Sequence, residues 1–297
     1  MAAVGEISSS CGGTNVGPPT IGRLPVNIVL PMITSLLGFS FAGVLLTRFA
    51  RRHQPYYLVW TLGLLWYALA AGSEALGGIS GWSPGLYKAW YITGAIGVAA
   101  YLGAGTVYLH KEPSFGSLTV VCFLVGSIPA LAGRHLPVGL FALAAAIVLT
   151  MVLTWRPTWF AHALFAILLL TSLLAASSVV NAKIDQGLLP IPDQVVSGQA
   201  FDPETRALTP PFNIAGAAVL ILGALMSALH FWRTRALPKR VAANVLIAVG
   251  AFIPSLSSGL TRFGITSLFF AGELLGLLFI LGGFLLSSST DSSSQVT

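Results

Sequence analysis

The segment 265–286 reads ITSLFFAGELLGLLFILGGFLL, and its only charged side chain is that of Glu273. A helix of about 20 mostly apolar residues is long enough to cross the hydrocarbon core of a bilayer. Eight other segments meet or approach this requirement: 26–47, 57–77, 88–109, 116–133, 137–154, 159–180, 212–232 and 241–260. The sequence therefore predicts an all-α, polytopic integral membrane helical bundle with nine transmembrane helices.

Two of these segments leave the helix count open. The segments 116–133 and 137–154 are short, and only Gly-Arg-His-Leu-Pro (133–137) lies between them. A tight helical hairpin, or a pair with one re-entrant member, would give eight transmembrane helices, which is the alternative to nine.

The composition of the whole chain excludes several classes of protein. Of its 297 residues, 55% are hydrophobic and 8% are charged, whereas about a quarter of the residues of a soluble domain are charged. The chain therefore cannot cover a water-facing surface, which excludes a soluble enzyme, a disordered chain and a nucleic-acid-binding domain. The expected partner is the lipid bilayer, and a formal net charge of +6 is typical of basic loops beside anionic lipid.

The distribution of basic residues predicts an orientation. If the N-terminus is outside, the inner segments carry nine basic residues and the outer segments carry six. The dense clusters RFARRH (48–53) and RTRALPKR (233–240) both lie at inner ends of spans. The positive-inside rule then places the N-terminus outside and the C-terminus inside.

The predicted spans divide the chain into five parts. Residues 1–25 are an outer tail and 26–180 a six-helix membrane region. Residues 181–211 are a long outer loop containing Pro, Gly and acidic residues, and 212–286 are a three-helix membrane region. The Ser-rich segment 287–297 is predicted to be a disordered inner tail.

Glu273 is the clearest candidate for chemistry inside the membrane. It lies about nine residues into the last predicted span, roughly 13 Å from the outer end, and an ionisable group at such a depth is costly. Gly272 and Gly276 form a GxxxG pattern, which lets a neighbouring helix approach closely. A proton, cation or ligand counter-ion site is one interpretation, and a protonated packing glutamate is the other.

A second carboxyl group and a proline–serine segment are candidates to complete such a site. Glu74 lies about one turn from the outer interface, where it faces water, pairs with Lys88 or Arg262, or shares an outer-half cavity with Glu273. Pro254 in the eighth span frees a backbone carbonyl. The hydroxyls that can satisfy this carbonyl are those of Ser255, Ser257 and Ser258.

Two histidines suggest a competing site. His162 and His230 lie near the inner ends of different spans and are candidate axial ligands of one b-type haem. Ordinary placement of histidine at a membrane interface is the alternative. No CxxC, HxxxH or HExxH spacing occurs, so no metal site is predicted and no cofactor is firmly indicated.

A ladder of small residues predicts a close contact between helices. Ala95, Ala99 and Gly103 recur every four residues in the third span, so they line one face of that helix.

The segment 57–109 also carries a family resemblance. It contains Gly81-Trp82, Tyr87-Lys88, Trp90-Tyr91 and LGAGTVYL (102–109), and the last span adds GELLG. With these motifs the chain resembles uncharacterised multi-pass membrane proteins of actinobacteria and related bacteria. The resemblance implies a protein of the bacterial inner membrane and no particular activity.

Three classes of function remain. The first is a transporter-like or small-ligand- or ion-binding membrane protein with a site near Glu273. The second is a non-catalytic membrane subunit or sensor-like module that docks partner proteins, as a homo-oligomer or within a membrane complex. The third is a haem- or quinone-binding redox subunit. No pair of catalytic residues supports an enzyme.

Overall fold

The structure is a bundle of long, antiparallel helices. The computed structural model describes residues 26–110, 112–133, 135–192, 194–235, 238–261 and 264–293. Within these ranges, nine helices are long and apolar enough to cross a membrane. The prediction of an all-helical protein with nine helices of membrane-spanning length is confirmed for these residues. The predicted tail 1–25 lies outside them.

Eleven helical segments build these nine spans, because α3, the π-helical segment η1 and α4 form one continuous rod. The long helices are α1 (Val26–Arg52), α2 (Pro55–Ser80), α3 (Pro84–Trp90) with η1 (Tyr91–Val98) and α4 (Ala99–Leu109), α5 (Pro113–Ala132), α6 (Leu136–Trp155), α7 (Phe160–Asn181), α9 (Thr209–Arg233), α10 (Pro238–Thr261) and α11 (Phe269–Ser293). The short elements are η2 (Pro157–Trp159), η3 (Gln186–Leu188), η4 (Gly198–Ala200) and α8 (Pro203–Ala207).

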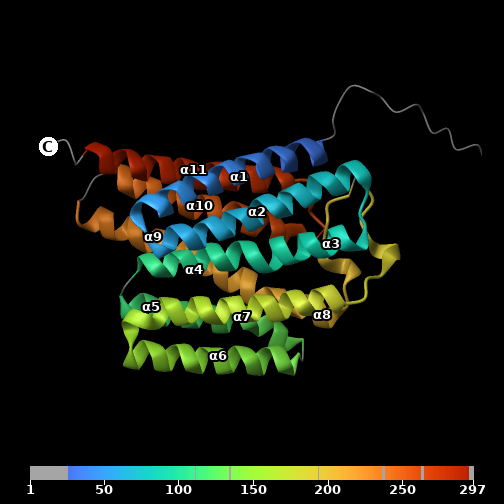
Figure 1. Cartoon of the computed structure of the whole chain (residues 1–297), viewed down its shortest axis with the longest axis horizontal. Helices are drawn as coiled ribbons and strands as arrows, with labels where there is room; N and C mark the ends of the chain where they lie inside the picture. The colour runs from blue at the N-terminus through green and yellow to red at the C-terminus, as the bar shows by residue number, and fades with distance from the viewer. Residues whose placement is uncertain are drawn as a thin grey trace, which may run out of the picture.

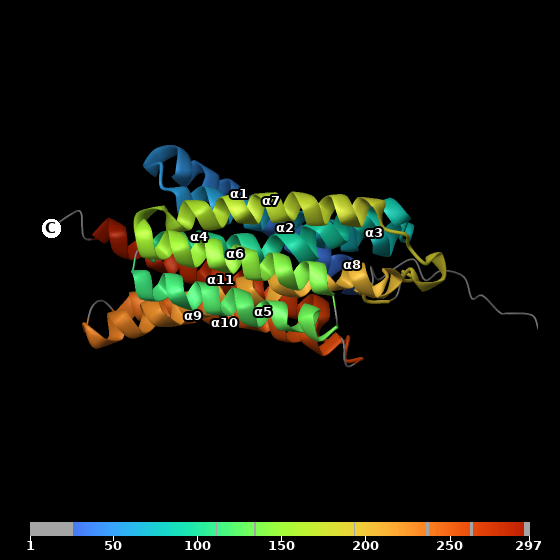
Figure 2. The ribbon, with the colours of Figure 1, turned by 90° about the horizontal axis from the view of Figure 1, so that it is seen from below.

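Consecutive long helices run in opposite directions, so the bundle has two distinct ends (Figures 1 and 2). One end carries residues 182–202 and is called the loop end. The opposite end carries Arg48, Arg51 and Arg52 near the end of α1 and Arg233 at the end of α9, and is called the basic end. The sequence predicts the inner and outer sides from the same gathering of basic residues at one end of the spans.

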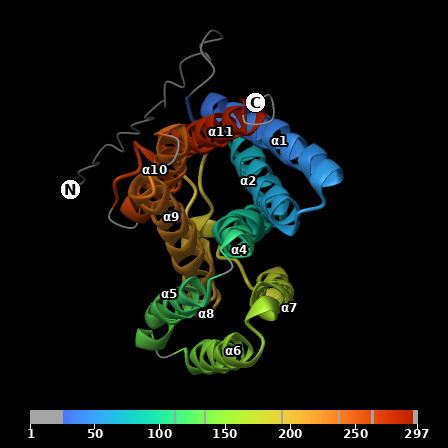
Figure 3. The same ribbon diagram turned by 90° about the vertical axis from the view of Figure 1, so that its left-hand side faces the viewer.

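Viewed from the basic end, the helices form two groups that share α4 and α9 (Figure 3). Helices α1, α2, α10 and α11 lie on one side, and α5, α6 and α7 lie on the other. The most extensive contacts join α1 to α2, α10 to α11, and α9 to α10, α4 and α5. Helices α6 and α7 make fewer contacts, and they expose many large apolar side chains.

Local chemistry explains where several helices begin and end. Pro55, Pro84 and Pro113 occupy the first helical position, where the missing N–H of proline costs no hydrogen bond. Gly81 follows α2 with a φ of 80°, a conformation that glycine adopts without steric cost. The chain therefore turns sharply there and enters α3.

The structure decides the open question about segments 116–133 and 137–154. Helices α5 and α6 are each 20 residues long, which is the length needed to cross a bilayer. They are two full antiparallel helices, so the described residues favour nine spans over eight.

Two predicted boundaries move. The segment 181–211 is not all loop, because α8 begins at Pro203 and α9 begins at Thr209. Pro210 and Pro211 lie in the first turn of α9, where proline is tolerated. At the other end of the chain, α11 continues to Ser293, so the helix ends later than the sequence predicts.

Candidate functional site

A buried and a half-buried glutamate bring their carboxyl groups together between α2 and α11. Glu74 lies on α2, six residues before its end, and its side chain is only 3% exposed. The carboxyl group of Glu273, on α11, lies within hydrogen-bonding range of the carboxyl group of Glu74. We call Glu74 and Glu273 the carboxyl pair. Of the arrangements that the sequence leaves open for Glu74, the structure therefore shows the one that joins it to Glu273.

The depth of Glu273 differs from the sequence prediction. Helix α11 begins at Phe269 rather than at residue 265, because Gly264 adopts a φ of 83° and residues 264–268 form turns. Glu273 is therefore about 6 Å along its helix instead of 13 Å. Glu74 and Glu273 consequently lie within two helical turns of the loop end on antiparallel helices.

Two aromatic side chains hold the carboxyl pair in place. Trp90 donates its indole N–H to Glu74 Oε1 at 2.8 Å. Tyr67 lies about two helical turns before Glu74 on α2. It donates its hydroxyl to the backbone carbonyl of Glu273 at 2.8 Å. The first contact orients one carboxyl group and the second anchors the helix that carries the other.

The remaining oxygen atoms of the pair have no ordinary donor. Oε2 of Glu74 and Oε2 of Glu273 are both buried, and neither receives a hydrogen bond from an N–H or hydroxyl group of the described residues. No Lys, Arg or His side chain in that part of the chain pairs with either carboxyl group. Lys88, a predicted partner of Glu74, instead donates to the Val180 carbonyl at 2.7 Å, and Arg262 lies outside the described residues.

The chemistry of two adjacent carboxyl groups follows from these contacts. An ionised carboxylate is an acceptor only, so a hydrogen bond between two carboxyl groups requires a proton on at least one of them. Two carboxylates about 4 Å apart would repel each other by about 4 kcal/mol at an effective dielectric constant near 20. The geometry is thus suited to holding one shared proton, or a cation in its place.

The backbone beside Trp90 is unusual. Trp90 is the last residue before the π-helical segment η1, and such segments are rare and often occur at functional sites. A Cβ atom at Gly94 would lie 3.3 Å from Ala70 Cβ and 3.8 Å from Trp90 Nε1. Gly94 therefore lets η1 approach α2 closely at the level where Trp90 contacts Glu74.

The long loop covers this region at the loop end. Tyr87 donates its hydroxyl to the Ser197 carbonyl, and the same oxygen accepts the Ala200 N–H at 3.2 Å. The Phe201 ring lies 5.1 Å from the Tyr87 ring and 4.6 Å from the Tyr91 ring. The loop therefore packs onto the aromatic cluster to which Trp90 belongs.

The proline–serine segment of α10 is split between two faces. A Cβ atom at Gly276 would lie 2.6 Å from Pro254 Cδ, and one at Gly272 would lie 2.5 Å from Ser257 Oγ. Pro254 and Ser257 thus face α11 beside Glu273, at the GxxxG pattern. The other two serines, Ser255 and Ser258, are exposed and point elsewhere.

The ladder of small residues in the third span meets α9. A Cβ atom at Gly103 would lie 2.6 Å from the Gly216 carbonyl oxygen, and one at Gly216 would overlap the backbone of Ala99. The third member, Ala95, lies in η1 and packs against the aromatic cluster. The sequence did not reveal Gly216 as the partner, because a single glycine in an apolar helix has no distinctive pattern.

The two candidate haem ligands have other neighbours. His162 Nδ1 lies 3.1 Å from the Tyr108 hydroxyl, and the His230 ring lies 5.7 Å from the Phe231 ring. Both histidines are exposed, and they belong to α7 and α9. The structure does not bring them together through any contact that the described residues show.

No cluster of three or more His, Cys, Asp or Glu side chains is present in the described part of the chain. A cation bound between α2 and α11 would take its ligands from the carboxyl pair and from backbone carbonyls.

Trp90 and Tyr67 are the functional residues that sequence reasoning missed. A tryptophan near the end of a span is typical of a membrane interface, yet the side chain of Trp90 is only 9% exposed and donates to Glu74. The signal that could have found it is its spacing of sixteen residues from Glu74 across a short turn. No family model, curated protein or solved structure matches this chain.

Proposed function

We propose that this chain is a transporter-like or ion-binding membrane protein in which Glu74 and Glu273 together take up and release a proton. The observation that carries the proposal is the direct approach of these two carboxyl groups, which have no basic partner among the described residues. By the resemblance in the segment 57–109, we place the protein in the bacterial inner membrane.

A packing role for the carboxyl pair would also depend on a bound proton. A packing glutamate needs a donor for each buried oxygen, since an unsatisfied buried polar atom costs about 1–3 kcal/mol. Here the Oε2 atom of each residue lacks one. The two Oε2 atoms can therefore accept a proton or a small cation. When that proton or cation leaves, two negatively charged carboxylates remain side by side and repel each other.

The carboxyl pair also lies where a change in its charge acts on the contact between two helices. Glu74 belongs to α2, and Glu273 belongs to α11, which packs on the proline-containing helix α10. A change in the charge of the pair alters the attraction between two helices from distant parts of the chain. Coupling of a proton to helix movement is a recurrent design of membrane transporters.

Infrared difference spectroscopy of the purified protein tests the proposal directly. A change of pH should reveal the C=O stretch of a protonated carboxylic acid, and Glu74→Gln and Glu273→Gln should each remove or displace that band. Glu204→Gln is the matched control, because Glu204 is an exposed carboxyl group at the loop end. A band that is unchanged in both pair variants would show that the pair does not exchange a proton.

An uptake assay tests the wider claim of transport. Glu273→Gln should abolish proton uptake by cells or vesicles that contain the protein, while the amount of protein in the membrane stays the same. Unchanged uptake would refute a transport role for Glu273, whatever the infrared result.

A further inference from the structure

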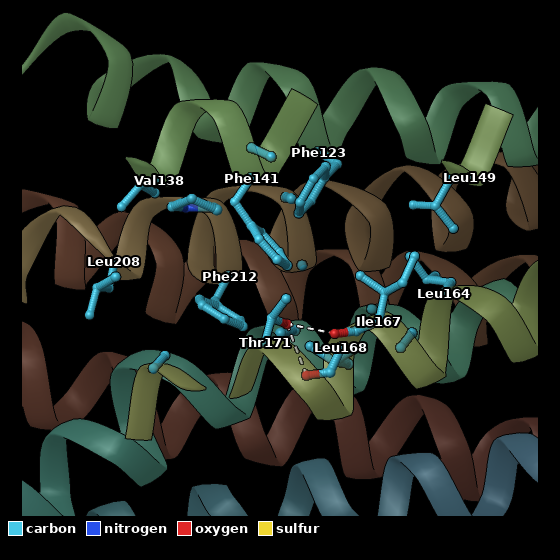
Figure 4. A pocket seen from close by; sticks show the side chains of 18 of the residues that line it. Phe123, Val138, Phe141, Leu149, Leu164, Ile167, Leu168, Thr171, Leu208 and Phe212 are labelled. Atoms are coloured by element: carbon cyan, nitrogen blue, oxygen red, sulfur yellow. Dashed lines mark hydrogen bonds between the residues drawn. The ribbon is translucent and has the colours of Figure 1, made fainter. Parts of the chain in front are cut away.

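The second group of helices encloses a cavity that has no connection to the carboxyl pair. Helices α4, α5, α6, α7 and α9 form a ring when the bundle is viewed end-on (Figure 3). The cavity between them has a volume of about 280 Å³. Phe123, Phe141, Phe212 and Leu164, from four different helices, converge on this space (Figure 4).

The lining offers no free polar group. Its hydroxyl groups are already bonded within their own helices: Thr171 Oγ1 donates to the Ile167 carbonyl at 2.8 Å, Thr119 Oγ1 to that of Phe115 at 2.8 Å, and Ser178 Oγ to that of Leu174 at 3.0 Å. A buried water needs two to four polar partners, and apolar cavities of about 150 Å³ stay dry and bind small hydrocarbons. The cavity is therefore suited to an apolar ligand without a polar head inside it.

The cavity is long and narrow. On α7 the lining runs from Leu164 to Ser178 with helical spacing, which at 1.5 Å per residue is a length of about 21 Å. A volume of about 280 Å³ spread over that length makes the cavity an elongated channel rather than a rounded chamber. The shape fits an extended hydrocarbon chain lying parallel to the helices.

Access to the cavity is from the side. Helix α7 makes far fewer contacts with α4 and α6 than α9 makes with α4 and α5. Two lining residues are also more than a third exposed, Leu174 at 53% and Phe141 at 42%, which fits a cavity that is open rather than sealed. In a membrane this surface faces lipid, so the chains that meet the opening are those of phospholipids.

We infer that the cavity bounded by α4, α5, α6, α7 and α9 binds one acyl chain of a membrane phospholipid, which enters beside α7. This site is independent of the carboxyl pair and of the proposed transport function. The headgroup stays outside, because the hydroxyl donors of the described lining are already used within their own helices.

Photo-crosslinking of the full chain tests this inference. The probe is phosphatidylcholine with a diazirine in the middle of one acyl chain, added to the detergent-purified protein and mapped by peptide mass spectrometry. Adducts should concentrate on cavity-lining residues of α6 and α7, and an excess of unlabelled phosphatidylcholine should abolish them. Adducts spread over the exposed faces, or adducts that competitor does not reduce, would overturn the inference.

A pair of variants on α6 isolates the cavity. Ala142 is buried and lines the cavity, whereas Ala144, two residues away, is exposed. Ala142→Phe should reduce the cavity adducts at least tenfold, and Ala144→Phe should leave them unchanged. Equal labelling of the two variants would overturn the inference. If Ala142→Phe does not fold, the saturable adduct map of the unaltered protein decides the question.

A parallel reaction distinguishes the source of the chain. A free fatty acid with the same diazirine should label the cavity more weakly than the phospholipid does. Labelling by the fatty acid alone would refute the assignment to a phospholipid.

Discussion

Trp90 donates its indole N–H to Oε1 of Glu74 across 2.8 Å, and both side chains are buried. This hydrogen bond joins the end of α3 to α2, at the point where α3 passes into the π-helical segment η1. It leaves the other oxygen of Glu74 free for Glu273. The Trp90–Glu74 hydrogen bond thus connects the π-helical segment η1 to the carboxyl pair.

Replacing Trp90 with phenylalanine should destabilise the protein by about 1–3 kcal/mol, because a buried carboxyl oxygen loses its donor. Thermal unfolding of the purified protein, followed by circular dichroism in detergent, measures this change. Trp155→Phe is the control, since Trp155 is 74% exposed at the end of α6. Equal effects of the two substitutions would show that the hydrogen bond contributes nothing.

Replacing Tyr87 with phenylalanine should loosen the loop of residues 182–202. The variant loses the bonds from Tyr87 to Ser197 and from Ala200 to Tyr87, at about 0.5–1.5 kcal/mol each. Cleavage by trypsin after the exposed residue Lys183 should become severalfold faster. Tyr108→Phe removes a hydroxyl near the basic end and should not alter this rate; an equal acceleration there would contradict the assignment.

Adding one methyl group at Gly216 should separate α9 from α4. A Cβ atom at this position would overlap the backbone of Ala99, and overpacking of this kind costs about 1–3 kcal/mol. Gly43→Ala is the matched control, because a Cβ atom there meets nothing within 4 Å. The melting temperature should fall for Gly216→Ala and stay constant or rise for Gly43→Ala. A melting temperature that does not fall for Gly216→Ala would refute the close contact.

Asp202, at the start of α8, should make the end of the loop sensitive to acid. Partial burial raises its pKa, but hydrogen bonds from the Thr205 N–H at 2.8 Å and Oγ1 at 2.9 Å outweigh this and hold the pKa below its usual value. A carboxyl group with a lowered pKa stabilises the folded state at neutral pH and loses that effect as the pH falls through the folded-state value.

Asp202→Asn should abolish this acid response, because an amide does not titrate in that range. Hydrogen exchange of the Thr205 amide, measured at neutral pH and at about pH 3, reports the difference. Protection that falls in acid for both proteins would show that another group is responsible.

Several features of the fold could be predicted because they depend on local sequence. The mean hydropathy of a segment such as 265–286 is a sum over neighbouring residues, so spans are visible without knowledge of their partners. Boundaries were less predictable. The start of α11 moved to Phe269 because Gly264 adopts a left-handed turn, which hydropathy does not register.

The candidate site was only partly predictable for the same reason. An isolated glutamate in an apolar helix is conspicuous, and Glu273 and Glu74 were both found. The partners Trp90 and Tyr67 were not, since aromatic residues near a predicted interface are common and carry no signal of what they contact.

By itself the sequence determined that the chain forms apolar helices of membrane-spanning length and that two of them carry a carboxyl group, because hydropathy and charge belong to individual residues. Only the tertiary structure decided that Glu74 faces Glu273, that Gly216 fits against Ala99, and that five helices enclose an elongated cavity. In a chain where nearly every helix is apolar all round, the hydrophobic pattern does not say which faces meet. That choice depends on shape and hydrogen bonding between helices far apart in the chain.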